Sequence, residues 1–66
     1  MKYCVLAGKI VERNFSYDDI ARSLGTSTKT LKGKVRGKTP FTWNEVVIMQ
    51  NEYFPDIDKD TLMQAM

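Results

Sequence analysis

Two glycines, Gly25 and Gly37, divide the middle of this chain into two short segments that each have the marks of a helix. A glycine after a helical pattern supplies the left-handed residue with which helices commonly end. Only Thr26 separates Gly25 from Ser27, a residue type that favours the beginning of a helix. Helices joined so closely must cross at a steep angle, so residues 16–37 are predicted to form a helix-turn-helix.

Both segments have the apolar spacing that a buried helix face requires. The predicted inward-facing residues are Ile20, Ala21, Leu24, Leu31 and Val35. Ser16 is predicted to cap the second helix of the chain, with the Asp19 carboxylate as its partner in a capping box. The pair of helices therefore has one face directed to a core and another left for solvent or a partner.

Helical signals continue on both sides of this motif. Residues 3–13 are a predicted first helix, residues 43–53 a fourth that starts with the capping box of Thr42 and Glu45, and part of 56–66 a short last helix. Trp43 is predicted to lie in the core, and Cys4 to pack beside the first helix. The sequence thus predicts an all-α fold of five helices in a single domain, residues 1–66, with one modest core.

The composition argues against several classes of function. The chain has no histidine and Cys4 is its only cysteine, which disfavours zinc fingers, disulfide frameworks and the usual nucleophile–base pairs. We therefore expect no enzyme activity, no metal and no cofactor. A chain of 66 residues has little room for a site that senses a small-molecule effector. The apolar run at residues 3–8 is too short for a signal peptide or a membrane span, so we expect a cytoplasmic protein.

Charge is divided unevenly along the chain. Residues 1–38 contain nine Lys or Arg and three Asp or Glu, whereas residues 39–66 contain one and five. The densest basic run has no acidic residue within it and consists of Lys29, Lys32, Lys34, Arg36 and Lys38. Such a run is typical of a phosphate-binding surface, although a solvated helix face has the same composition.

One face of the third helix is predicted to be polar, basic and slim. Its residues follow each other at a spacing of three and four: Thr28, Lys29, Lys32, Gly33 and Arg36. Lys34 points partly away from this face. Gly33 costs roughly 1 kcal/mol relative to alanine inside a helix. The missing side chain lets the helix approach a ligand closely, or it permits close packing within the chain, or Gly33 is simply a tolerated poor helix former.

Residues 16–38 resemble the motif of the phage repressor and Cro-like helix-turn-helix family, often called the Xre type, along its whole length: SYDDIARSLGTSTKTLKGKVRGK. The segments PFTWNEVV and FPDIDKDTL resemble the tail of small prophage-encoded members. The resemblance implies a lambda-repressor-like fold. It also implies a sequence-specific DNA-binding transcriptional regulator, a Cro-like phage or prophage repressor whose third helix, residues 28–36 or nearly so, enters the major groove of operator DNA.

The same resemblance implies roles for particular residues. The positions that match base or flanking-phosphate contacts are Ser27, Thr28, Lys29, Lys32 and Gly33. Arg36 and Lys38 match positions that hold the DNA backbone. Tyr17 stands where the family usually has glutamine, which leaves a phosphate contact and simple surface packing as alternatives.

Two further alternatives concern the partners of the chain. The same fold also serves as a protein-interaction module, an antirepressor or assembly partner, and this reading is favoured only if the basic face is dispensable. Near the carboxyl end, Phe54, Ile57, Leu62 and Met63 form either a patch for a homodimer on DNA or a tail that covers the core.

Overall fold

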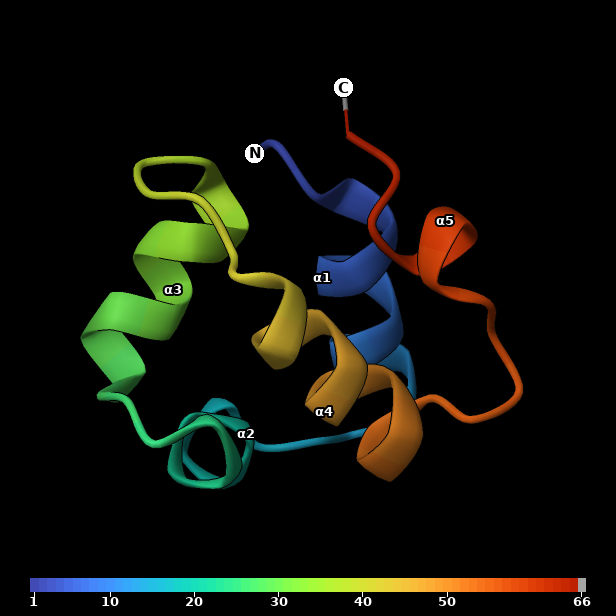
Figure 1. The fold of residues 1–66 in the computed structure, drawn as a ribbon, viewed down its shortest axis with the longest axis horizontal. Coiled ribbons are helices and arrows are strands. Elements are labelled where there is room, and N and C mark those ends of the chain that lie inside the picture. Colours follow the sequence, from blue (N-terminus) through green and yellow to red (C-terminus); the bar gives the residue numbers. More distant parts are fainter. Residues whose placement is uncertain (66) are drawn as a thin grey trace.

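The computed structural model describes residues 1–65, which are helical with no strand among them (Figure 1). The helices in this range are α1 (Cys4–Glu12), α2 (Tyr17–Leu24), α3 (Thr28–Arg36), α4 (Trp43–Tyr53) and α5 (Lys59–Leu62). The predicted all-α class and the five helices are confirmed. The last helix is shorter than the segment in which it was expected, and Met66 lies outside the described residues. In Figure 1, α3 and α5 lie on opposite sides of the molecule, with α1 and α4 between them.

The boundaries of α2 and α3 follow from their local chemistry. Ser16 Oγ accepts a hydrogen bond from the amide of Asp19 at 3.4 Å, as predicted for an N-cap. The reciprocal half of that capping box was predicted wrongly, because the Asp19 carboxylate instead lies 3.8 Å from the guanidinium of Arg22. Gly25 and Gly37 end the two helices with left-handed backbone angles, φ +72° and φ +94°.

The core lies where all five helices meet. Its buried apolar side chains are Leu6, Ile10, Ile20, Ala21, Leu31, Val35, Met49, Phe54 and Leu62. Four of the five inward-facing residues predicted for the central helices belong to this set. The fifth, Leu24, is half-buried in the last turn of α2 and packs against the edge of the core.

Two residues predicted to be buried are exposed. Trp43 has 70% of its surface exposed, although it was predicted to lie in the core. It is the first residue of α4, and Phe41, just before the helix, packs against the core edge there, with its ring 5.4 Å from that of Tyr3. Cys4 is likewise exposed at the start of α1, with its thiol donating to the carbonyl oxygen of Met1.

The carboxyl-terminal segment covers the core. Phe54 and Leu62 are completely buried within the chain, so their prediction as part of a dimer patch is wrong. The physical reason is that α5 folds back against α1 and α4, so that Leu62, on α5, and Phe54, at the end of α4, both join the core. Ile57 and Met63 are half-buried and also pack against the core. The segment therefore covers the core, and a contact of Ile57 and Met63 with a second copy stays a prediction.

Polar contacts fix the position of the surrounding elements. The Tyr53 hydroxyl of α4 lies 2.7 Å from that of Ser23 and donates to the carbonyl of Asp19 at 3.2 Å, which holds α2 against α4. Both terminal nitrogens of the Arg13 guanidinium donate to the Asp56 carboxylate, at 2.8 and 2.6 Å. These hydrogen bonds lower the pKa of Asp56 from 3.8 to about 2.

Candidate nucleic-acid interface

The outward face of α3 and the loop after it surround one open groove. Its lining residues are Thr28, Lys29, Thr30, Lys32, Gly33, Arg36, Lys38 and Thr39. Four of them are cationic and none is acidic. The structure therefore brings together four of the five residues predicted to contact bases and both of the α3-side residues predicted to contact phosphate. Tyr17 and Ser27 lie outside the lining.

Gly33 is one of the residues that line this groove. The amide of Lys38 donates to the Gly33 carbonyl at 2.9 Å, which turns the loop back toward α3 after Gly37. A methyl group on Gly33 would meet only the Cβ of Lys38, at 4.0 Å. Close packing within the chain therefore does not require a glycine here. The remaining explanations are a tolerated poor helix former or the approach of a ligand.

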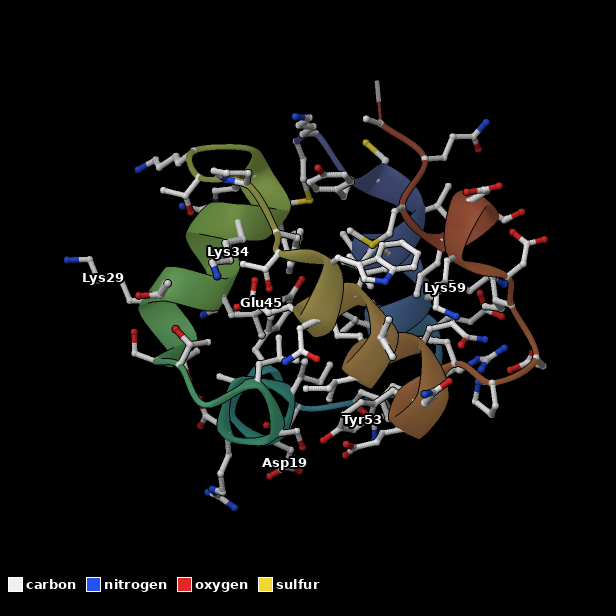
Figure 2. All side chains as sticks on the ribbon, in the orientation of Figure 1. Asp19, Lys29, Lys34, Glu45, Tyr53 and Lys59 are labelled. Atoms are coloured by element: carbon white, nitrogen blue, oxygen red, sulfur yellow. The ribbon has the colours of Figure 1, made fainter. Side chains whose placement is uncertain are left out.

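The two lysines predicted to read bases are both exposed, but they are held differently. Lys29 extends away from the body of the molecule (Figure 2). Lys32 leans over α2, with its ammonium 5.7 Å from the centre of the Tyr17 ring. A cation at this distance from an aromatic face is attracted by the ring. Tyr17 is itself half-buried against the core, so the ring beneath the Lys32 ammonium is held in place.

The hydroxyl groups at the start of α3 already have partners within the chain. Ser27 Oγ accepts from the amide of Thr30 at 3.1 Å and lies 2.9 Å from the Thr30 hydroxyl, which it approaches as donor. Thr28 Oγ1 donates to the carboxylate of Asp18 on α2. The contact between Thr28 and Asp18 joins the beginning of α3 to α2. These contacts also occupy hydrogen-bonding capacity that sequence reasoning had assigned to DNA.

Lys34 is excluded from the groove by a contact with α4. Its ammonium lies 2.5 Å from the Glu45 carboxylate, and both side chains are largely buried, as they point toward each other in Figure 2. Burial raises the pKa of Glu45, but hydrogen bonds from Lys34 and Thr42 lower it further, so that it lies below its ordinary value. Glu45 also accepts from the Thr42 amide at 2.9 Å in the predicted capping box. The Glu45 carboxylate thus caps the start of α4 and pairs with Lys34 of α3.

The amino terminus lies beside the same helix. The amide of Tyr3 donates to the carbonyl of Val35 at 3.1 Å, and the side chain of Lys2 covers Gly37. Met1 lines a small hollow together with Tyr17, Lys32 and Arg36. Sequence reasoning assigned no role to Lys2. Its charge was visible, but its proximity to the end of α3 depends on a backbone pairing between distant residues that no local pattern reveals.

We found no match to this chain among protein-family models, curated proteins or solved structures. None of the helices in residues 1–65 has the length and apolar character needed to cross a membrane. In the same part of the chain, no three His, Cys, Asp or Glu side chains are grouped as metal ligands would be.

Proposed function

We propose that this chain is a sequence-specific DNA-binding transcriptional regulator, a Cro-like phage or prophage repressor in type, with α2 and α3 as its helix-turn-helix. The observation that carries the proposal is the groove on the outer face of α3, which four cations and no acid line. A helix fits the major groove of B-DNA, and lysine donors there can bind the O6 and N7 atoms of guanine.

In this proposal Lys29 and Lys32 contact base edges, and Gly33 lets the helix backbone come close to them. Arg36 and Lys38, at the end of α3 and in the loop after it, contact phosphates. We add Lys2 to the phosphate contacts, because its methylene groups lie over Gly37 at the end of α3, with its ammonium 5.4 Å from the centre of the Tyr3 ring.

Charge within the chain also supports this orientation. Lys34, the one cation of the basic run on another side of α3, is paired with Glu45. The remaining cations of the run line the groove. A helix that was basic merely for solubility would have no reason to direct its unpaired cations to one side.

Selection of binding sites from random duplex DNA, followed by footprinting, tests the proposal. We expect a consensus to be enriched and then protected by the purified protein. If no sequence is enriched, the chain does not read DNA sequence, and the protein-interaction module becomes the better account of the fold.

A further inference from the structure

An acidic residue lies beside the basic groove, where α3 begins. The Asp18 carboxylate, in the first turn of α2, accepts a hydrogen bond from the hydroxyl of Thr28, the first residue of α3, and Thr28 lines the groove. Within residues 1–65 Asp18 forms no ion pair, whereas its neighbour Asp19 lies 3.8 Å from the guanidinium of Arg22. An unpaired acid next to a surface that attracts phosphates weakens this attraction. The position of Asp18 therefore indicates a role that its charge alone does not explain.

The direction of this hydrogen bond follows from the chemistry of its two groups. An ionised carboxylate has no proton to donate, so the proton between the two side chains belongs to Thr28. A threonine hydroxyl has only one proton. Once this proton is given to Asp18, the Thr28 oxygen has lone pairs only, and in the groove it accepts hydrogen bonds without donating any. Donation to a carboxylate also polarises the hydroxyl, which makes its oxygen a better acceptor.

Helix caps hold both partners of this hydrogen bond in place. The amide of Asp18 donates to the hydroxyl of Ser16, the N-cap of α2, at 3.1 Å. Thr28 follows Ser27, whose hydroxyl caps α3 by accepting from the amide of Thr30 at 3.1 Å. Hydrogen bonds to an ionised partner are roughly twice as strong as those between neutral groups. A neutral keto oxygen of a base therefore competes poorly with Asp18 for the Thr28 proton.

The edges of the bases differ in the polarity of their hydrogen-bonding groups. In the major groove, N6 of adenine and N4 of cytosine are amino donors, whereas O6 of guanine and O4 of thymine are keto acceptors. A threonine hydroxyl that rotates freely contacts either kind of group. A hydroxyl whose proton is held by a carboxylate contacts only the amino groups, because its lone pairs repel those of a keto oxygen. The polarity of Thr28 therefore determines which bases it accepts.

We propose that Asp18 determines specificity by holding the proton of Thr28, so that Thr28 selects an adenine or a cytosine in the DNA site. This inference rests on the proposed function and adds one base contact to it. The cations that line the groove are donors only, which suits guanine. Thr28 supplies the opposite polarity at the start of α3. Asp18 acts through Thr28 and is a positioning residue, which does not itself contact the DNA.

Affinities for duplexes that differ from a selected site at one base pair test this role. Thr28→Val removes the hydroxyl at nearly constant size, so the position at which it alters the base preference is the one that Thr28 reads. There we expect wild type to prefer A over G, or C over T, by about tenfold, within the usual cost of one mismatched base pair. In Asp18→Ala the hydroxyl rotates freely, so this preference should fall to about twofold or less. Preferences at the other positions should stay as in wild type.

Asp19→Ala is the matched control, because it removes the neighbouring acid of α2, which lies near Arg22 rather than Thr28. Loss of one negative charge should strengthen binding of all DNA in both alanine variants, but only Asp18→Ala should change a base preference. Each preference is a ratio of two affinities of one variant, so partial unfolding cancels.

Three results would overturn the role of Asp18 and leave the proposed DNA binding intact. In the first, Asp18→Ala keeps every wild-type preference. In the second, it lowers the preference at all positions alike, as a loosened helix pair would. In the third, Thr28→Val alters no position. If wild type enriches no sequence from random duplex DNA, the proposed function fails, and this inference fails with it.

Discussion

At the scale of single residues, Tyr17 and Lys32 illustrate how one side chain can position another. Tyr17 is packed against the core, and the ammonium of Lys32 lies over its ring. The sequence left a phosphate contact and surface packing open for Tyr17. The structure adds a further contact, because the Tyr17 ring lies under the Lys32 ammonium and limits the directions that this side chain can take.

Tyr17→Phe and Tyr17→Leu separate these roles. Phenylalanine keeps the aromatic face and leucine does not, so we expect Tyr17→Phe to keep the preference for a selected DNA site and Tyr17→Leu to lower it. The loss should be roughly two- to fivefold, since a cation near an exposed ring gains about 0.5–1 kcal/mol. Competition binding against a scrambled site measures it. If Tyr17→Phe instead weakens binding to both sites equally, the hydroxyl contacts a phosphate.

The substitution Gly33→Ala is expected to have opposite effects on the stability of the fold and on the affinity for DNA. The added methyl group has open space around it and favours the helix, so the free energy of unfolding should rise by up to about 1 kcal/mol. Affinity for the selected site should fall by about 1 kcal/mol or more, because the added methyl group stands on the face of α3 that we propose to lie against base edges. Urea denaturation and a binding titration give the two values. A variant that is more stable and binds as well as wild type would show that Gly33 is only a poor helix former.

Among the helices, local sequence signals predicted where each helix begins and ends better than which residues it contacts. Ser16, Ser27 and Thr42 all cap helices as predicted, because an N-cap depends on the few residues that follow it. Trp43 was misplaced, because whether the first turn of a helix meets the core depends on neighbours that are distant in sequence. The engagement of Thr28 with Asp18 depends equally on the crossing of two helices.

Glu45→Ala tests how α3 is held against α4. It removes the capping partner of Thr42 and leaves the largely buried ammonium of Lys34 without its carboxylate. We expect the free energy of unfolding to fall by about 1–3 kcal/mol, the range for an unpaired buried hydrogen-bonding group. Glu52→Ala removes an exposed acid from the same helix and should stay within about 0.5 kcal/mol of wild type. Equal denaturation midpoints for the two variants would show that the pairing of Glu45 with Lys34 does not stabilise the packing of α3 against α4.

At the scale of the whole molecule, the fold class was predictable but the role of the carboxyl-terminal segment was not. Five helices followed from caps, glycines and apolar spacing. Phe54 and Leu62 gave no sign of whether they cover the chain's own core or meet another copy, because both uses need the same apolar side chains. The contact of Lys2 with Gly37 could not be predicted either, because the two residues are 35 positions apart in the sequence.

Asp56→Asn tests how the segment before α5 is tied to the end of α1. The Asp56 pKa is lowered by Arg13, so the charged carboxylate stabilises the folded state above the ordinary pKa of 3.8, and this contribution disappears as the pH falls to about 2. We expect Asp56→Asn to be less stable than wild type at pH 7, and the difference to vanish near pH 2. Urea denaturation across this pH range measures it. A difference that is independent of pH would show that the ion pair does not cause it.

We propose that the outer face of α3 reads DNA sequence with Lys32 and holds the backbone with Arg36. The most direct test is to measure the affinity of Lys32→Ala and Arg36→Ala for a selected site and a scrambled site over a range of salt concentrations. Lys32→Ala should lower the ratio of the two affinities by an amount equivalent to about 1–3 kcal/mol. Arg36→Ala should weaken both and make the dependence of log affinity on log salt shallower by about one. Wild-type affinity and salt dependence in both variants would contradict the claim.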